Sequence, residues 1–481
     1  MFNSFLLWLD RTRLHLYKNS VHLPVRQIQL GSLSGELSHT SVDRSINFDI
    51  IASLVLLQGW ITLLLAPAHA TSSCEFRGII DVVLQILTIE PTRIQNTVSN
   101  DVMGELRDYL KAHPDFEKAF KEAFELARTY NIPQFEDPKF VPYKIETFEN
   151  YLRFYGDMLK WVPSETSDGK NVYYHLCMFY FVIDLDPVKR YQTPIDPTSK
   201  KPWTWLSDWL ISYAKAVGKF LDTEESLNAE TLKSFDVYGM DQYPHFPGTW
   251  KTFNQFFARY IDPKVRLIAQ GPNIIVSPAD ATFGGSWPID SKAEVIIKGL
   301  PWKISELLGD HSVYANHFDG GYFAHSYLAP SDYHRQHTPV AGIVKERKVI
   351  EGLCYLQVIA KPDENGQMGL SAVRSEFNMP DDPGYQFIQA RGVVVIDTKG
   401  FGDFGLVAVC PIGMAQVSSV VLNDNIKEGH YVEKGQEISH FQMGGSDIVV
   451  LFENNVQITA MKDVHYKVGE EIAKFIAPGH C

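Results

Sequence analysis

Residues 443–452 read MGGSDIVVLF, and this stretch decides how the C-terminal half of the chain folds. The apolar run Ile448–Phe452 follows two glycines and Ser446, which is the pattern of a buried strand that begins directly after a turn. Gly445 has no side chain, so a strained turn is accessible at this position. The sequence therefore predicts a central strand with a serine at its start.

The surrounding region, from about residue 270, is typical of β-structure. Glycine, proline and β-branched residues become frequent and the apolar runs shorten. Residues 428–436 read EGHYVEKGQ and predict a tight turn in which glycine supplies a positive φ. Further strands are predicted at Gly342–Ile350, Gly392–Ile396, Leu406–Val409 and Val417–Leu422.

Upstream of this region the helical period dominates. Val102, Leu106 and Leu110 recur at helical spacing, and Pro114 suits the first turn of the next helix. The expected fold class is α+β: a helical N-terminal domain at 76–235 is followed by a β-rich catalytic domain at 236–481. Further apolar stripes lie within residues 116–127, 148–159 and 206–217.

Residues 1–75 form a leader in this interpretation. Its segment 50–66 carries no charge and has the length of a short membrane span, with five Lys or Arg residues before it. An anchor or targeting segment would place residues 1–49 on the cytoplasmic side of a membrane. The alternative is a buried or interfacial helix. The expected localisation is cytoplasmic, with membrane association through 50–66 under the first interpretation.

Charge and cysteine content exclude several classes of protein. The 44 Lys and Arg residues are outnumbered by 57 Asp and Glu residues, and no basic run stands out, so we expect no nucleic-acid partner. The five cysteines are scattered and odd in number, which argues against a disulfide scaffold or a cysteine-rich zinc site. A reducing compartment fits this pattern.

Two polar segments precede the serine. The first reads SPAD and ends at Asp280, and the second reads SDYHRQHTP over 331–339. His334 and His337 lie three residues apart beside Asp332, but the sequence places no acidic third ligand, so we expect no metal. Proton transfer is the better use of imidazoles that titrate near neutral pH. A hydrogen-bonded loop without a catalytic role is the alternative.

Ser446 allows three interpretations. A serine hydrolase could use Ser446, His337 and Asp280 as a triad, but the nucleophile elbow G-x-S-x-G fails because Ile448 stands at its last position. A turn into a strand without chemistry is the second. The third is self-cleavage, in which the hydroxyl of Ser446 attacks the carbonyl of Gly445, with Gly444 adding flexibility and a histidine taking the proton.

Together these segments resemble the phosphatidylserine decarboxylase family, which is pyruvoyl-dependent. The family pattern is an S-P-x-D segment, a Y-H-R-x-H segment and a Gly-Ser cleavage site, and all three occur in that order within residues 236–481. More loosely, residues 98–235 are similar to the extra domain of a fungal branch that includes a tryptophan decarboxylase of psilocybin biosynthesis. The stretch Phe253–Arg259 also belongs to this looser similarity.

The resemblance implies roles for these residues. His337, held by Asp280 and Asp332, would deprotonate Ser446, and the precursor would divide into chains 1–445 and 446–481. The pyruvoyl group made from Ser446 would be the only cofactor, forming a Schiff base with the α-amine of the substrate as CO₂ departs. His334 would handle the substrate carboxylate or reprotonate the α-carbon.

The substrate stays open between two classes. Asp447 departs from the usual Leu-Gly-Ser-Thr cleavage segment, which favours a free L-amino acid, with an aromatic one such as tryptophan as the candidate, in secondary metabolism. The apolar 50–66 segment favours phosphatidylserine and phospholipid biosynthesis. An inactive scaffold is a further alternative, and a PLP enzyme built on Lys361 has no support from the residues around that lysine.

Overall fold

The computed structural model describes residues 101–476 except 245–249, 298, 310, 363–365, 373–383, 403 and 416–419. Residues Asn96–Cys481 form one compact unit that holds both helices and sheets, so the expected division at residue 235 stays a prediction. None of the described helices combines the length and the apolar character needed to cross a bilayer. The 50–66 segment lies outside the described residues.

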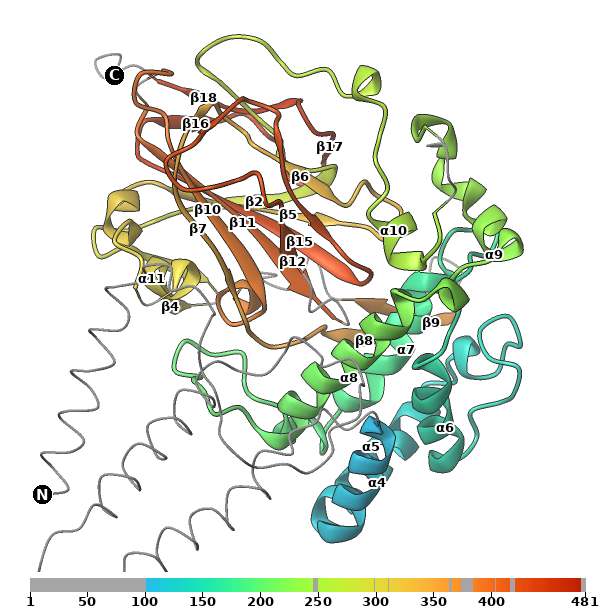
Figure 1. The fold of residues 1–481 in the computed structure, drawn as a ribbon. Coiled ribbons are helices and arrows are strands. Elements are labelled where there is room, and N and C mark those ends of the chain that lie inside the picture. Colours follow the sequence, from blue (N-terminus) through green and yellow to red (C-terminus); the bar gives the residue numbers. More distant parts are fainter. Residues whose placement is uncertain are drawn as a thin grey trace, which may run out of the picture. The chain divides into compact units, whose positions relative to one another are not determined.

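The first part of the described chain is helical, as the sequence predicts (Figure 1). Pro114 occupies the first turn of its helix, and the side chains of Asp101, Thr147 and Thr204 cap three others by accepting main-chain hydrogen bonds. The larger helices are α4 (Val102–Ala112), α5 (Pro114–Thr129), α6 (Phe148–Met158), α7 (Asn171–Ile183) and α8 (Trp205–Leu221), and the shorter ones are α9 (Ala229–Ser234), α10 (Phe253–Phe257) and α11 (Ile304–Leu308).

Strands dominate from residue 274 onward, which confirms the α+β class. They are β1 (Ile274–Val276), β2 (Ala281–Pro288), β3 (Glu294–Ile297), β4 (Leu300–Lys303), β5 (Tyr322–Leu328), β6 (Arg335–His337), β7 (Gly342–Ile350), β8 (Val358–Pro362), β9 (Met368–Ala372), β10 (Arg391–Asp397), β11 (Leu406–Met414), β12 (Val420–Leu422), β13 (Tyr431–Val432), β14 (Glu437–Phe441), β15 (Gly445–Phe452), β16 (Val456–Ile458), β17 (His465–Tyr466) and β18 (Glu471–Phe475).

An eight-stranded antiparallel sheet is the framework of this part, in the order β13-β7-β10-β11-β15-β5-β2-β17. The strand that carries Ser446, β15, lies inside it between β11 and β5, as the apolar run predicts. A three-stranded sheet β12-β14-β6 carries the histidine segment. The predicted single turn at 428–436 is instead two turns, which contain Gly429 and Gly435 with φ of 81° and 83°, and the short strand β13 lies between them.

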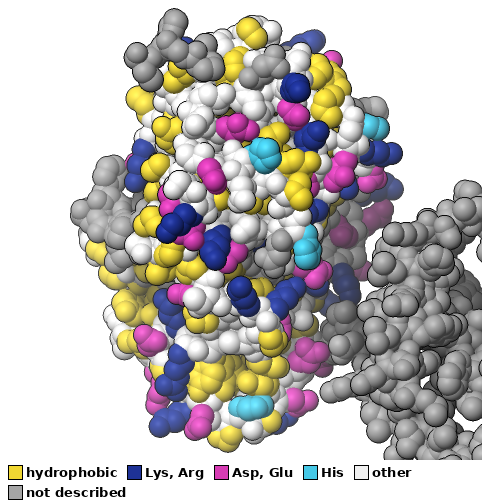
Figure 2. All heavy atoms as spheres, turned by 90° about the vertical axis from the view of Figure 1, so that its left-hand side faces the viewer, with side chains coloured by type: hydrophobic (Ala, Val, Ile, Leu, Met, Phe, Trp, Pro, Cys, Tyr) yellow, Lys and Arg dark blue, Asp and Glu magenta, His cyan; other side chains and the backbone are white. Residues whose placement is uncertain are grey.

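The two faces of the large sheet pack against different cores. Alternate residues such as Ile448 and Val450 join a cluster that is continuous with the helices, whereas Val449 and Leu451 join a second cluster with α11. Helix α7 contacts β8 and β9, where the main-chain N–H of Val358 donates to Asp184 at 2.7 Å. On the face shown in Figure 2, basic and acidic side chains are intermixed.

Candidate active site

Ser446 lies at the beginning of a strand that is paired on both sides. It stands opposite Gly413 of β11 and Leu328 of β5, and its side chain is fully buried. Gly444 has a φ of 143°, a conformation that side chains rarely allow, and the chain bends there before β15 begins. The turn therefore delivers the Gly445–Ser446 bond directly to a fixed position in the sheet.

His334 is the histidine that meets Ser446. Its Nδ1 lies 3.3 Å from the hydroxyl oxygen of Ser446, and its Nε2 lies 3.3 Å from the carbonyl oxygen of Pro330. A carbonyl oxygen can only accept, so Nε2 carries the hydrogen and the neutral ring presents an unprotonated Nδ1 to Ser446. The ring stacks on Phe257 with centroids 3.9 Å apart. The arrangement suits removal of the hydroxyl proton.

His337 has different partners. Its Nδ1 donates to the carbonyl oxygen of Gly435 at 2.7 Å, and its Nε2 accepts from the hydroxyl of Tyr333 at 3.1 Å. Burial lowers the pKa of His337 below its usual value, which favours the neutral ring. Among the described contacts, the structure therefore brings His334 and not His337 to Ser446.

Asp280 is paired with an arginine that the sequence did not single out. Its carboxylate receives hydrogen bonds from Nε of Arg266 at 3.0 and 3.1 Å, from Nη2 of the same side chain, and from the main-chain N–H of Val468 at 2.7 Å. The described contacts do not join Asp280, His337 and Ser446 into one hydrogen-bonded row. Asp280 acts on His337 through its charge, which opposes the lowering of that pKa by burial.

Asp332 fixes the loop before the histidines. One carboxylate oxygen accepts from the main-chain N–H of Ala329 at 2.7 Å, and the other pairs with Nε2 of His465 at 3.1 Å. The hydrogen bond to Asp332 raises the pKa of His465. In this structure Asp332 therefore stabilises a turn rather than orienting His337.

The segment after α10 holds the histidine segment in place. Arg259, which is fully buried, donates to the carbonyl oxygens of Ser331 at 2.9 Å and Asp332 at 3.2 Å. Arg335 donates in return to the carbonyl oxygen of Ala258 at 2.7 Å. Sequence reasoning noted the stretch Phe253–Arg259 only as a similarity. Its supporting role could not be inferred from a pattern, because the contacts join residues more than 70 positions apart.

A second polar cluster lies one residue further along the strand. Asp447 was noted in the sequence as a charge beside Ser446, and the structure directs its side chain to the opposite face of the sheet. There it contacts His325, Tyr385 and Gln386, none of which the sequence singled out. Among the described residues, no group of three or more His, Cys, Asp or Glu side chains could hold a metal ion.

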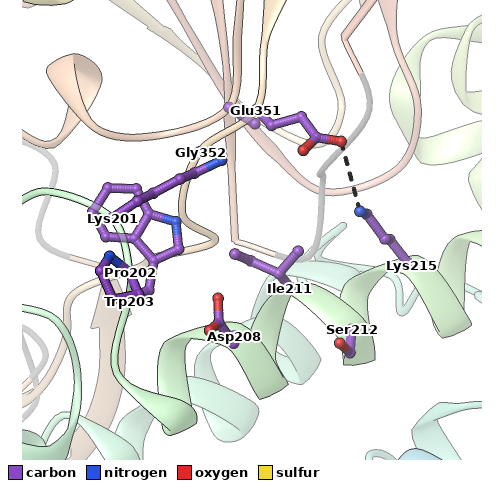
Figure 3. Close-up of a pocket in the computed structure, with 10 residues that line it drawn as sticks. Lys201, Pro202, Trp203, Asp208, Ile211, Ser212, Lys215, Glu351 and Gly352 are labelled. Carbon is purple, nitrogen blue, oxygen red and sulfur yellow. Dashed lines mark ion pairs between the residues drawn. The ribbon is translucent and has the colours of Figure 1, made fainter. Parts of the chain in front are cut away.

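A cavity of about 630 Å³ lies between α8 and the residues Glu351, Gly352 and Ala390 (Figure 3). Lys215 of α8 and Glu351 face each other across it as an exposed ion pair at 3.8 Å. Ala390, which also lines it, accepts a hydrogen bond from Gly413, the residue opposite Ser446. Neither Ser446 nor His334 is among the residues that line this cavity.

Comparison with known proteins supports one family. The sequence model of phosphatidylserine decarboxylase matches residues 253–474. The phosphatidylserine decarboxylase proenzyme of Brevibacillus brevis is 33% identical over 244 residues, covering 48% of this chain and 78% of that protein. The proenzyme of Shewanella frigidimarina is 32% identical over 248 residues, which cover 50% of this chain and 84% of that protein. Proenzyme 3 of Schizosaccharomyces pombe is 35% identical over 227 residues, which cover 47% of this chain but only 21% of that longer protein.

Ser446 is thus a buried serine that follows a glycine turn and lies beside Nδ1 of His334. The class is that of pyruvoyl-dependent decarboxylases, which are carboxy-lyases. The chain belongs to the phosphatidylserine decarboxylase family. The described helices from α4 to α9 precede the matched residues.

Proposed function

We propose that the chain cleaves itself between Gly445 and Ser446 and that the product decarboxylates a substrate with an α-amino acid group. The observation that carries this proposal is the 3.3 Å contact between Nδ1 of His334 and the hydroxyl of Ser446, with the ring hydrogen directed at Pro330. A hydroxyl is a weak nucleophile until a base takes its proton, and His334 is placed to take it.

The proposed cleavage balances with water as the only co-reactant. His334 takes the hydroxyl proton, the oxygen of Ser446 bonds to the carbonyl carbon of Gly445, and the amide bond breaks as its nitrogen is protonated. Loss of the α-hydrogen of residue 446 then breaks its Cβ–O bond and leaves Gly445 as a carboxylate. Water replaces the nitrogen of residue 446, which departs as ammonia, so that a ketone remains at the start of chain 446–481.

The site residues fit such a group. The ketone would stand where Ser446 stands, at the end of β15, with His334 on one face of the sheet. It supplies an electron sink for the electrons that departing CO₂ leaves on the substrate. After cleavage is complete, His334 still lies beside position 446 and is free to transfer a second proton. We assign it the proton that returns to the substrate carbon.

Intact-mass measurement of the full chain and of Ser446→Ala tests this proposal. Wild type should yield two chains, with the break before residue 446 and the serine nitrogen lost from the shorter chain. The variant should remain whole. A wild-type protein that stays intact under every condition in which it is folded would overturn self-cleavage and favour the scaffold interpretation.

For the substrate, the names of the relatives favour phosphatidylserine. A free L-amino acid is the second candidate, favoured by helices that precede the family match and by the buried Asp447 beside the cleavage serine. Release of CO₂ from phosphatidylserine in mixed micelles, compared with release from L-serine and L-tryptophan, separates the two. Activity on lipid alone would exclude the free amino acid, and activity on tryptophan alone would exclude the lipid.

A further inference from the structure

Asp447 is a buried carboxylate on the strand that would form the new chain end. It stands opposite Ile412 of β11 and Tyr327 of β5, and its side chain is fully buried. Because successive side chains of a strand alternate, it lies on the face of Val449 and Leu451, away from Ser446 and His334. It therefore takes no part in the contact that we assign to cleavage.

Three donors converge on one oxygen of this carboxylate. Oδ2 of Asp447 lies 2.8 Å from Nε2 of His325, 2.5 Å from the hydroxyl of Tyr385 and 3.1 Å from Nε2 of Gln386. His325 and Gln386 are themselves buried. A buried carboxylate is costly unless it is hydrogen-bonded or paired, so the three contacts on Oδ2 offset the cost of burying Asp447, whose Oδ1 has no hydrogen-bond partner among the described residues.

The contacts cross the proposed break in the chain. His325, Tyr385 and Gln386 all belong to residues 1–445, whereas Asp447 is the second residue of chain 446–481. Before cleavage they are contacts within one chain, and after it they join two. A new chain end frays unless it is tied down, and misplacement of a reacting group by about 1 Å can cost on the order of 100-fold in rate.

We propose that Asp447, with His325, Tyr385 and Gln386, is a clamp that holds residue 446 in its reactive position after cleavage. The inference rests on the proposed function. Asp447 is a positioning residue in this account, because it acts through the placement of residue 446. The clamp is dispensable for cleavage itself, during which the intact backbone still holds Ser446 against His334.

The test uses Asp447→Asn in the full chain, with Asp184→Asn as the matched control. Asp184 is also a buried carboxylate that accepts a main-chain and an amide hydrogen bond, but it lies between α7 and β8. Asp447→Asn should still cleave before residue 446. Its kcat should fall about 10- to 100-fold with KM within about threefold, and amide hydrogen exchange over residues 446–452 should accelerate. Asp184→Asn should leave kcat and that exchange at wild-type values.

Tyr385→Phe provides a milder variant if Asp447→Asn fails to fold. It removes one of the three donors, so the same changes should appear at smaller size. Wild-type kcat and exchange in a cleaved Asp447→Asn protein, or equal effects in the Asp184 control, would overturn the clamp. So would loss of cleavage in folded Asp447→Asn and Tyr385→Phe. Failure of the proposed function is distinct from these outcomes, because there the wild-type chain itself stays whole.

Discussion

Buried polar side chains in the helices and in the large sheet have different kinds of partners. In the helical part, the hydroxyl of Tyr155 donates to the carbonyl oxygen of Phe179 at 2.8 Å, and that of Tyr213 donates to the carbonyl oxygen of Tyr155 at 2.6 Å. In the sheet, two clusters gather around the consecutive residues Ser446 and Asp447. The helical contacts join one helix to another, whereas the sheet contacts surround one end of a strand.

This difference separates two properties that a mutation can change. A substitution among the helices should alter the free energy of unfolding and leave cleavage intact in the folded protein. A substitution beside Ser446 should alter cleavage by more than its effect on stability. The following experiments test this separation.

The largest effect is expected for His334→Ala. Loss of the base that faces Ser446 should slow cleavage by about 10²- to 10⁴-fold. His337→Ala should slow it far less, since the ring of His337 contacts Gly435 and Tyr333. The measurement is the time course of precursor loss after synthesis, with His430→Ala, at an exposed position within 428–436, as control. Cleavage that depends on His337 and not on His334 would restore the assignment made from the sequence.

The next effect is expected for Phe179→Ala, which should lower the stability of the protein and leave its cleavage unchanged. The ring of Phe179 is fully buried and lies 4.3 Å from that of Tyr155 and 4.6 Å from that of Tyr213. Its removal should lower the free energy of unfolding by about 3–5 kcal/mol. Denaturant unfolding measures the loss, and intact mass should show normal cleavage at temperatures where the variant is folded. Uncleaved but folded Phe179→Ala would contradict the separation.

A smaller, pH-dependent effect is expected from His175 in α7. Burial lowers its pKa to about 4, so the unfolded chain binds its proton first as the pH falls. The contribution of neutral His175 to the free energy of unfolding is complete above about pH 6.5. It is lost as the pH falls toward 4, and about 2 kcal/mol of it is gone at pH 5.

His175→Gln should therefore lose less stability than wild type between pH 7.5 and pH 5. The pKa of Asp184, which burial raises to about 7, contributes in the opposite direction. Because Asp184 is present in both proteins, its contribution cancels in the difference. Equal acid sensitivity of the two proteins would show that His175 does not titrate in this way.

The smallest effect is expected for Lys215→Ala at the cavity of Figure 3. Its ion pair with Glu351 is exposed and 3.8 Å long, so its loss should change stability by less than about 0.5 kcal/mol. Cleavage should be unchanged. A loss of lipid or amino acid turnover in this variant would instead connect the cavity with substrate binding.

Much of the fold follows from local pattern. The apolar stripes predicted α4, α5, α6 and α8, and β7 has the predicted bounds Gly342–Ile350. Helix α7 was missed, because nearly every residue from Asn171 to Ile183 is buried and no stripe of helical period remains in its sequence. Burial on all sides comes from tertiary packing, which a periodic pattern does not express.

The sequence predicted which residues belong to the candidate site better than it predicted which of them contact one another. The sequence drew attention to Ser446 and both histidines, but their partners depend on backbone geometry. His334 directly precedes β6 and His337 ends it, and residues three apart in an extended chain face opposite sides. Only one of them can therefore face Ser446. Arg266 and Gln386 reach their partners through folds of the chain that no local pattern specifies.

The interior place of β15 has a consequence for assembly. Chain 446–481 would contribute β15 to the middle of the large sheet, β17 to one edge, and β16 and β18 to the sheet with β1. Without it, the large sheet would lack the strand between β11 and β5. Folding of the precursor is a unimolecular process, whereas refolding of the cleaved protein would require two chains to meet, and its yield would depend on concentration.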